Sequence, residues 1–419
     1  MPPGGLTGPT AADVDAAAAR LGATTRVTPL RHNRRLSELL GAEVHLKRED
    51  VQTVRSYKVR GASNFIASLR PEDRAAGVVC ASAGNHAQGV AHACAMLGVR
   101  ARVYLPRTTP RQKRQRVQDL GREWVEVVVG GDLYDDAAAA AYADAERSGA
   151  TLVHAFDEPR TVAGQGTVIR EAVEQLGEQP DVVVVPVGGG GLLAGTITWL
   201  AERHPRTRIV GVEPAGAASM VAALDAGHPV DLPRVDPFVD GAAVSRAGAV
   251  TFPIVRDSGC EVVTVSEGAV CVEMLALYQT DGIIAEPAGA LATAALPELG
   301  IRPGEKVIAI VSGGNNDVTR YAEVVERALV HEGRKHYFLV EFPQEPGALR
   351  RFLDEVLGPD DDITLFEYVK HNNRETGPAL VGVELGSPAT LPELLARMEA
   401  APPHVERVPP DSPLFRFIL

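Results

Sequence analysis

Four consecutive glycines, Gly188 to Gly191, are the clearest candidate for a binding loop in this sequence. They follow the apolar run 181–187 and precede a helical stretch that opens at Leu192. Glycine lets the backbone turn tightly and bring consecutive N–H groups against an anion, and the dipole at a helix N-terminus adds attraction. The loop matches neither the GxGxxG nor the GxxxxGK nucleotide pattern. A flexible surface turn is the alternative, but the position at the carboxyl end of a buried strand favours a phosphate-binding loop.

Lys58 is the candidate nucleophile, although most lysines are solvated surface charges. Ser56 is a good N-cap, so we expect a helix to begin at or just after it and to carry Lys58 in its first turn. The positive end of the helix dipole disfavours a charged ammonium there, and partial burial acts in the same direction. We therefore expect a free amine that can form a Schiff base with a carbonyl compound.

Two further strand ends carry small and polar residues. The segment 82–86, SAGNH, follows the apolar run 78–82; its backbone N–H groups could hold a carboxylate, and Asn85 offers an amide. Ser312 follows the run 306–311 and opens the sequence SGGNN. For both segments the alternative is a plain strand-to-helix turn with a capping Asn or Ser.

Short β-branched runs alternate with longer amphipathic stretches between residues 43 and 330. The expected strands include 78–82, 101–106, 124–129, 181–187, 209–214, 261–265 and 306–311. The expected helices include 86–97, 132–148, 161–176, 192–203, 268–280 and 317–330. This alternation predicts an α/β fold with βαβ crossovers and a mostly parallel sheet, and the nearly continuous apolar runs are typical of strands buried on both faces.

The pattern changes near residues 331–336. Beyond them we expect strands at 336–342, 363–369 and 379–385, helices at 346–357 and 391–400, and a short apolar tail, FRFIL. The order β-α-β-β-α predicts a separate, small ferredoxin-like α+β domain.

The composition is that of an ordinary globular protein with a net negative charge. Lys and Arg number 42, and Asp and Glu number 54, so the formal charge is −12. The share of apolar residues, 45%, excludes disorder over most of the length. The negative charge argues against a general nucleic-acid binder or a protein that coats acidic membranes. At ~100–200 residues per domain, the length predicts two or three domains.

We find no sequence signal for a membrane span, secretion or a metal cluster. No segment approaches the ~18–20 apolar residues that cross a bilayer, and no secretory signal is visible. The four cysteines lack a CxxC pair, which favours free thiols over a disulfide or metal set. We interpret the basic run 107–116 as a solvated helix face, and His86 and His92 as packed or capping histidines. A cytoplasmic protein is expected.

Four motifs in order, SYKVRGA, SAGNHAQGVA, GGGGL and SGGN, resemble those of the fold-type II pyridoxal-phosphate enzymes, and specifically the threonine/serine dehydratase group. The resemblance covers about residues 20–330. It implies a tryptophan synthase β-like fold with two parallel-sheet subdomains. The catalytic domain would span 1–330, with a small subdomain, about 54–147, inserted in the large one.

The C-terminal module, with EFPQEPGAL at 341–349, resembles the ACT-like regulatory domain of the biosynthetic members of this group. On this resemblance residues 331–335 form a linker, and residues 336–419 form the regulatory domain.

The resemblance also implies roles for individual residues. Lys58 would bind pyridoxal 5'-phosphate covalently, Asn85 would contact the ring oxygen, Ser312 would hydrogen-bond the pyridine nitrogen, and Tyr57 would lie against the ring, where the group usually has Phe. The phosphate would be bound by backbone N–H groups of Gly188, Gly189, Gly190, Gly191 and Leu192. The substrate would be bound by Ser82, Ala83, Gly84, Asn85 and His86.

Some relatives hold a divalent cation at positions that match Glu213, the carbonyl of Ala217, and Ser219. Ser219 stands where those relatives carry Asp, and a hard cation prefers several oxygen ligands, so we expect no dedicated metal. Glu286 is expected to contact residues that bind the cofactor rather than the cofactor itself. The alternative is a carboxylate that interacts with a helix N-terminus.

The implied activity is the dehydration and deamination of L-threonine to 2-oxobutanoate and ammonia, the first step of isoleucine biosynthesis. After the substrate displaces it, Lys58 would take the Cα proton. Ser312, a neutral hydroxyl, would not keep a pyridine nitrogen protonated, which favours prompt β-elimination.

Isoleucine is the implied effector, and the implied assembly is a homo-oligomer, a tetramer or a dimer. The alternatives are a catabolic L-serine/L-threonine dehydratase or serine racemase on the same scaffold, and a non-catalytic amino-acid sensor. The sequence does not decide between threonine and serine.

Overall fold

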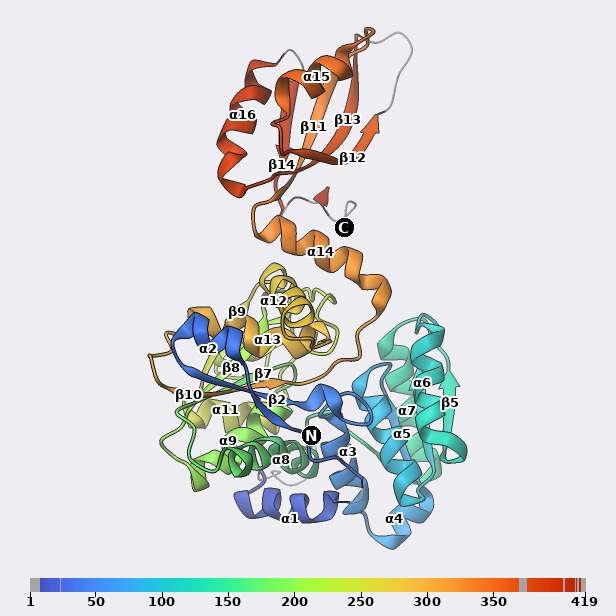
Figure 1. Cartoon of the computed structure of the whole chain (residues 1–419). Coiled ribbons are helices and arrows are strands. Elements are labelled where there is room, and N and C mark those ends of the chain that lie inside the picture. Colours follow the sequence, from blue (N-terminus) through green and yellow to red (C-terminus); the bar gives the residue numbers. More distant parts are fainter. Residues whose placement is uncertain are drawn as a thin grey trace. The chain divides into compact units, whose positions relative to one another are not determined.

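The computed structural model describes residues 8–22, 24–368, 375–401, 404–410, 412 and 414–415. The chain divides into two compact units, residues 1–317 and 318–419 (Figure 1). The division falls between Asp317 and Val318, so helix α14 (Tyr321–His331) lies in the C-terminal unit. The sequence analysis had placed the corresponding helix in the first domain.

The larger sheet of the first unit has six strands in the order β1-β2-β10-β7-β8-β9. In that order they are Leu30–His32, Glu43–Arg48, Lys306–Val311, Val182–Pro186, Arg208–Pro214 and Glu261–Val265. All neighbours are parallel except β1 and β2. The central strands β7 and β10 are buried almost throughout, which explains their continuous apolar sequences.

Helices cover both faces of this sheet (Figure 1). A core cluster joins β7 and β10 to helices α1 (Ala11–Leu21), α8 (Pro159–Leu176) and α9 (Gly191–Arg203). Helix α13 (Pro287–Ala295) packs against β7, β8 and β10. The remaining helices of this part are α2 (Arg34–Leu40), α10 (Ser219–Ala226), α11 (Thr251–Ser258) and α12 (Glu267–Gln279).

The smaller sheet of the first unit has four parallel strands in the order β5-β4-β3-β6. They are Val125–Val129, Ala101–Leu105, Val78–Ala81 and Thr151–Leu152. The helices packed around it are α3 (Lys58–Ala67), α5 (Asn85–Leu97), α6 (Arg111–Gly121) and α7 (Tyr134–Ser148). The short helix α4 (Pro71–Ala76) lies between α3 and β3 in the sequence and has no buried residue. The prediction of two parallel-sheet subdomains is confirmed.

The C-terminal unit is an antiparallel sheet in the order β12-β13-β11-β14. Its strands are β11 (Lys335–Pro343), β12 (Asp362–Tyr368), β13 (Thr376–Glu384) and β14 (His404–Val408), and its other helices are α15 (Ala348–Val356) and α16 (Leu391–Ala400). Side chains of β11 and β13 form a core with both helices. The ferredoxin-like prediction is confirmed. Val369, at the end of a predicted strand, and residues 416–419 of the predicted tail lie outside the described residues.

Single turns of 3-10 helix complete the chain: η1 (Glu49–Val51), η2 (Arg122–Trp124), η3 (Ala215–Ala217), η4 (Leu296–Glu298), η5 (Val318–Arg320) and η6 (Pro388–Thr390). All four cysteines are free thiols. Within the described residues, every helix is too short or too polar to cross a membrane.

Candidate active site

Lys58 is the first residue of α3, and the segment before it is held by the chain that follows β10. The predicted N-cap is wrong: Tyr57 occupies that position, and Ser56 instead pairs with Gly313 in an isolated β-bridge. The backbone N–H of Tyr57 donates to the carbonyl of Ser312 at 3.0 Å. The buried Ser56 hydroxyl has no partner among the described residues. The backbone pairing places the residue before Lys58 beside Ser312.

The Lys58 amine is half-buried and only weakly held by its surroundings. Its Nζ lies 3.3 Å from the carbonyl oxygen of Ala155 and 5.4 Å from the centroid of the Tyr57 ring. Burial lowers the pKa of Lys58 from 10.5 to about 8, although the negative charge of Glu286 opposes the shift. The amine is therefore much more often neutral near pH 8 than a surface lysine.

The glycine loop connects β7 to α9. Gly190 is the N-cap of α9 and adopts a φ of +90°, a conformation that favours glycine. A Cβ added at Gly189 would lie 2.3 Å from the ring of Phe156, and one added at Gly190 would lie 2.6 Å from Met220. Thr251 Oγ1 donates to the Gly189 carbonyl at 2.6 Å, which fixes the orientation of this peptide.

The backbone N–H groups of Gly188 to Gly191 donate to none of the described residues. Gly189, Gly190 and Gly191 are buried, and unpaired buried N–H groups are rare in folded proteins. Their donors gather at the N-terminus of α9, where the helix dipole is also positive. The loop therefore has the properties of an anion site and fits a phosphate group.

The segment 82–86 forms the turn between β3 and α5. The Gly84 N–H donates to Ser82 Oγ at 3.2 Å, whereas the N–H groups of Ala83, Asn85 and His86 donate to none of the described residues. Burial lowers the pKa of His86 to about 3, and its Nε2 lies 2.9 Å from the Val153 carbonyl. His86 is thus a packed, neutral histidine, and the turn offers backbone donors to a second anion.

Asn85 begins α5 and joins the two subdomains through its side chain. Its Nδ2 donates to Glu286 Oε1 at 2.6 Å, and its Oδ1 accepts from Asn315 Nδ2 at 2.7 Å. Burial raises the pKa of Glu286 to about 7, Asp240 adds to the shift, and the hydrogen bond from Asn85 opposes it. Asn315 had no role in the sequence analysis, because residues separated by 230 positions cannot be paired from one sequence.

Ser312 follows β10 and is buried. Its Oγ donates to the Ala288 carbonyl, in the first turn of α13, at 3.1 Å. A hydroxyl has one proton, so donating to a ring nitrogen would require Ser312 to turn away from this carbonyl. A Cβ added at the next residue, Gly313, would lie 2.1 Å from Glu286 Oε1, so the chain here approaches the Glu286 carboxylate closely.

Glu213 serves a helix terminus. Its two carboxylate oxygens accept from the backbone N–H groups of Met220, at 2.8 Å, and Val221, at 2.9 Å, in the first turn of α10. Burial raises the pKa of Glu213 to about 7 despite these bonds. Ser219 Oγ lies 3.5 Å from the same carboxylate. Within the described ranges, His, Cys, Asp and Glu side chains form no group of three arranged to hold a metal.

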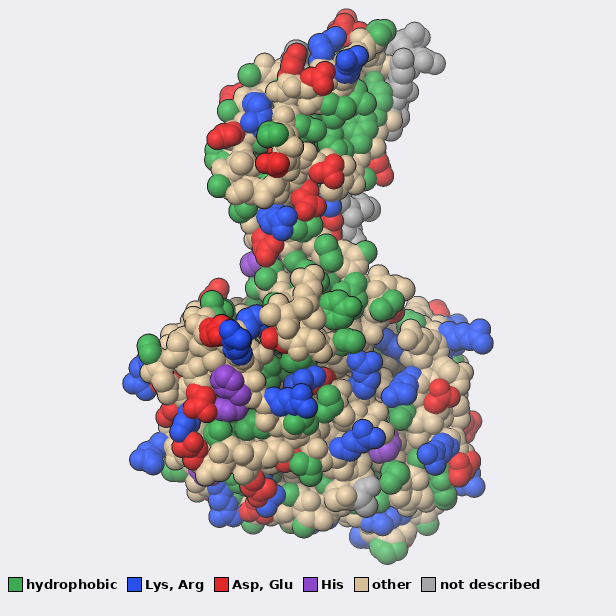
Figure 2. All heavy atoms as spheres, viewed as in Figure 1, with side chains coloured by type: hydrophobic (Ala, Val, Ile, Leu, Met, Phe, Trp, Pro, Cys, Tyr) green, Lys and Arg blue, Asp and Glu red, His purple; other side chains and the backbone are tan. Residues whose placement is uncertain are grey.

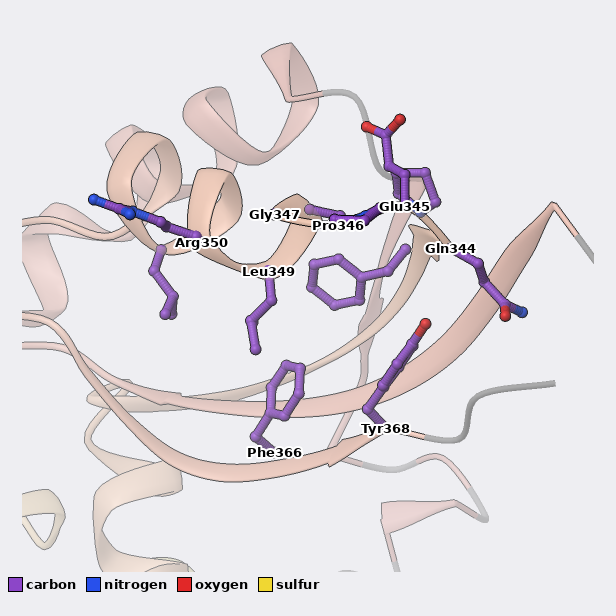
Figure 3. A pocket seen from close by; sticks show the side chains of 12 residues that line it. Gln344, Glu345, Pro346, Gly347, Leu349, Arg350, Phe366 and Tyr368 are labelled. Carbon is purple, nitrogen blue, oxygen red and sulfur yellow. The ribbon is translucent and has the colours of Figure 1, made fainter. Parts of the chain in front are cut away.

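The C-terminal unit contains a cavity of about 510 Å³ between the β11–α15 turn and β12. Leu349, Phe366 and Tyr368 point toward one another across it, whereas Glu345 and Arg350 point away (Figure 3). Figure 2 shows hydrophobic side chains gathered on the face of this unit that holds the cavity. The sequence analysis did not identify this cavity, because its lining comes from segments that meet only in the folded sheet.

Two family models match the chain. A pyridoxal-phosphate dependent enzyme family matches residues 22–313, and the C-terminal regulatory domain of threonine dehydratase matches residues 326–418.

Relatives of known name match nearly the whole chain. The biosynthetic L-threonine dehydratase of Mycobacterium tuberculosis is 62% identical over 410 residues, which cover 97% of this chain and 96% of that protein. The protein of the same name from Bacillus subtilis is 47% identical over 393 residues, 94% of this chain and 93% of that protein.

Solved structures resemble about three quarters of the chain. The processed threonine deaminase isoform 2 of Solanum lycopersicum has a TM-score of 0.72 and 37% identity, over 77% of this chain and 95% of that one. A serine racemase of Dictyostelium discoideum has a TM-score of 0.69 and 32% identity, over 74% of this chain and 99% of that one. The chain therefore belongs to the pyridoxal-phosphate dependent enzyme family and, within it, to the biosynthetic threonine dehydratases.

Proposed function

We propose that this chain converts L-threonine to 2-oxobutanoate and ammonia. One observation supports the proposal beyond the similarity: a lysine with a pKa of about 8 lies in the same unit as a buried loop whose N–H groups find no acceptor among the described residues. The first feature suits an amine that must react as a neutral nucleophile, and the second suits a phosphate. Together they match the two ends of pyridoxal 5'-phosphate, the cofactor of this family.

The residues that would hold the cofactor are those identified in the sequence. Gly188 to Gly191, with Leu192, would bind the phosphate through backbone N–H groups. Lys58 would hold the aldehyde carbon, Asn85 the ring oxygen and Ser312 the ring nitrogen. Tyr57, whose ring lies beside the Lys58 amine, would cover one face.

Bound pyridoxal 5'-phosphate supplies an aldehyde that condenses with amines and a ring that withdraws electrons from the substrate Cα. When the substrate amine takes its place on the cofactor, the Lys58 amine would be free to act as the base for the proton at the threonine Cα. The lowered pKa of Lys58 keeps this amine unprotonated at a pH where an ordinary lysine is charged.

The turn at 82–86 would orient the substrate. Its N–H groups at Ala83, Asn85 and His86 would bind the threonine carboxylate, which fixes the direction of the Cα–H bond relative to Lys58. Loss of the Cα proton and of the β-hydroxyl as water, followed by addition of water and release of ammonia, balances to 2-oxobutanoate and ammonia.

Ser312 would set the balance between elimination and other reactions. Its hydroxyl is neutral, and it would have to leave the Ala288 carbonyl in order to donate to the ring nitrogen. A neutral hydroxyl does not hold a proton on a ring nitrogen as a carboxylate would, so charge does not accumulate on the ring and prompt β-elimination is favoured.

The C-terminal unit would bind an amino-acid effector, for which isoleucine is our candidate. The cavity beside α15 is lined by Leu349, Phe366 and Tyr368, which suit a branched apolar side chain. Binding there regulates catalysis only if the effector prefers one of two states of the enzyme, with a coupling of ~1–3 kcal/mol. We also expect a homo-oligomer, a tetramer or a dimer, in the cytoplasm.

The test is a keto-acid assay of the purified holoenzyme with threonine and with serine, each with and without isoleucine. We expect threonine to be the better substrate, and isoleucine to reduce its turnover. A catabolic dehydratase or racemase would instead act mainly on serine without a response to isoleucine. A chain that releases no keto acid from either substrate would contradict the proposal.

A further inference from the structure

A network of hydrogen bonds fixes the orientation of the Asn85 side chain, and this network begins at the backbone carbonyl of Val54. Asn315 Nδ2 lies 2.8 Å from the Val54 carbonyl oxygen and 2.7 Å from Asn85 Oδ1. Asn85 Nδ2 lies 2.6 Å from Glu286 Oε1. The four residues come from four separate segments of the first unit.

The donor and acceptor of each hydrogen bond in this network follow from the chemistry of its two ends. A backbone carbonyl only accepts, so Asn315 must turn its NH₂ group, and not its oxygen, toward Val54. The second proton of the same NH₂ group then points to Asn85, so Asn85 must accept it with its side-chain oxygen. The Asn85 NH₂ group consequently faces Glu286, whose carboxyl accepts. The oxygen and nitrogen of both amides are thus assigned by the network as a whole.

Asn85 retains one unused donor in this arrangement. Its Nδ2 carries two protons, of which one is engaged by Glu286, and none of the described residues accepts the other. Were the Asn85 amide turned over, the same place would present an oxygen instead. A ring oxygen that carries negative charge is stabilised by a donor and repelled by an acceptor.

We propose that Asn315 is a positioning residue, which transmits the polarity of the Val54 carbonyl to Asn85 so that Asn85 offers an N–H to the cofactor's ring oxygen. The inference rests on the proposed function for its assignment of Asn85 to the cofactor. A purely structural alternative is that Asn315 only ties its loop to Val54; this alternative makes no use of Asn85.

Asn315→Asp is the informative substitution, because it keeps the shape and removes both donors. A carboxylate at position 315 attracts the Asn85 NH₂ group in competition with Glu286, so the orientation of the Asn85 amide is no longer fixed and its donor is withdrawn from the ring oxygen for part of the time. We measure the Kd of the apoprotein for pyridoxal 5'-phosphate by fluorescence titration. Loss of a hydrogen bond to a charged group predicts about tenfold or greater weakening. Asn85→Ala should weaken binding to a similar extent.

The double variant separates positioning from a structural effect. If Asn315 acts through Asn85, adding Asn315→Asp to Asn85→Ala causes little further change in Kd, whereas independent effects would multiply. A spectroscopic readout supports this. Loss of the donor raises the pKa of the ring oxygen, so the pH midpoint of the bound cofactor's visible band should rise in Asn315→Asp.

Failures of the two proposals are distinguishable. If Asn85→Ala weakens binding but Asn315→Asp leaves both Kd and midpoint unchanged, or if the two effects multiply, the positioning role is overturned and the proposed function stands. If Asn85→Ala itself leaves Kd unchanged, the placement of Asn85 beside the cofactor fails, and this inference fails with it. Should Asn315→Asp not fold, Asn315→Ala removes the same donors without a new charge, and the same comparisons decide.

Discussion

The glycine loop before α9 and the turn before α15 share a backbone conformation but lie in different surroundings, which fit different kinds of ligand. In each, a strand runs into a helix whose N-cap is a glycine of positive φ, +90° at Gly190 and +89° at Gly347. The surroundings differ. A Cβ at Gly190 would lie 2.6 Å from Met220, whereas a Cβ at Gly347 would find only Arg351, at 3.7 Å.

This difference indicates what each turn recognises. The first is buried at the end of a parallel strand and has backbone N–H groups without an acceptor among the described residues, so we propose that it binds through the main chain and requires glycine for reasons of space. The second borders a cavity lined by Leu349 and aromatic rings, so we propose that it binds through side chains, and that its glycine is needed only for the backbone conformation. We expect the first to tolerate almost no substitution and the second to be adjustable.

The largest expected effect is the loss of activity on replacing Lys58, the lysine proposed to hold the same cofactor as the glycine loop. Lys58→Ala removes both the attachment point and the base, so kcat for threonine should fall by about 10³-fold or more. Lys306→Ala, at a lysine paired with Glu178 on the surface, is the control and should keep its activity. A Lys58→Ala enzyme with a tenth of the normal kcat would contradict the assignment.

The two N-cap glycines allow a direct comparison. Gly190→Ala and Gly347→Ala each force a left-handed backbone on alanine, at a cost of roughly 1–2 kcal/mol of folding stability. Only Gly190→Ala should also weaken pyridoxal 5'-phosphate binding, by about tenfold or more, because the crowded loop must move and misdirect its N–H groups. Titration of both apoproteins with the cofactor measures the affinity, and thermal unfolding measures the stability. An equal loss of cofactor affinity in the two variants would contradict the proposal that only the loop before α9 binds the cofactor.

A substitution that fills the second site should affect regulation alone. Leu349→Trp places a large ring in the cavity and competes with the effector for space, so the isoleucine concentration for half-inhibition should rise by about tenfold or more. The kcat without isoleucine should not change. Leu39→Trp, at an exposed residue of α2, is the matched control. An unaltered isoleucine response in Leu349→Trp would exclude this cavity as the effector site.

The smallest effect is a shift in pH dependence. Burial lowers the pKa of Lys58 to about 8, and only the neutral amine attacks an aldehyde. The rate at which apoprotein attaches the cofactor should therefore rise about tenfold per pH unit below that pKa and level off above it. Stopped-flow absorbance measures this rate.

Glu286→Gln sharpens the pH experiment. The Glu286 carboxylate raises the pKa of Lys58, so its neutralisation should move the midpoint to a lower pH. Burial makes the larger contribution to the pKa of Lys58 and lowers it. A midpoint near that of an ordinary lysine, 10.5, would show that the Lys58 amine is solvated.

The sequence predicted best what depends on local pattern. The bounds of β10 agree with the apolar run 306–311, because a strand buried on both faces has a continuous apolar sequence. The bounds of β9 agree with the run 261–265, although β9 is an edge strand of which only Val265 is buried; its β-branched residues carry the signal. The edge strand β14, with the mixed sequence HVERV, was not predicted, since it is mostly exposed and its pairing with β11 is a tertiary effect.

What the sequence could not supply is the network behind the motifs. Ser56 has the side chain of an N-cap, but the β-bridge to Gly313 takes it out of that position. The bond between Asn85 and Glu286 spans 201 residues, so it cannot be read from local spacing. The motifs indicate which residues matter, and the pairings across the fold determine how they are oriented.

Reduction of the holoenzyme with borohydride, followed by peptide mass spectrometry, tests the central claim most directly. Reduction should fix one pyridoxyl phosphate group per chain on the peptide that contains Lys58, and activity should be lost in proportion to labelling. A label confined to another lysine, or an active enzyme that carries no label at all, would contradict the account.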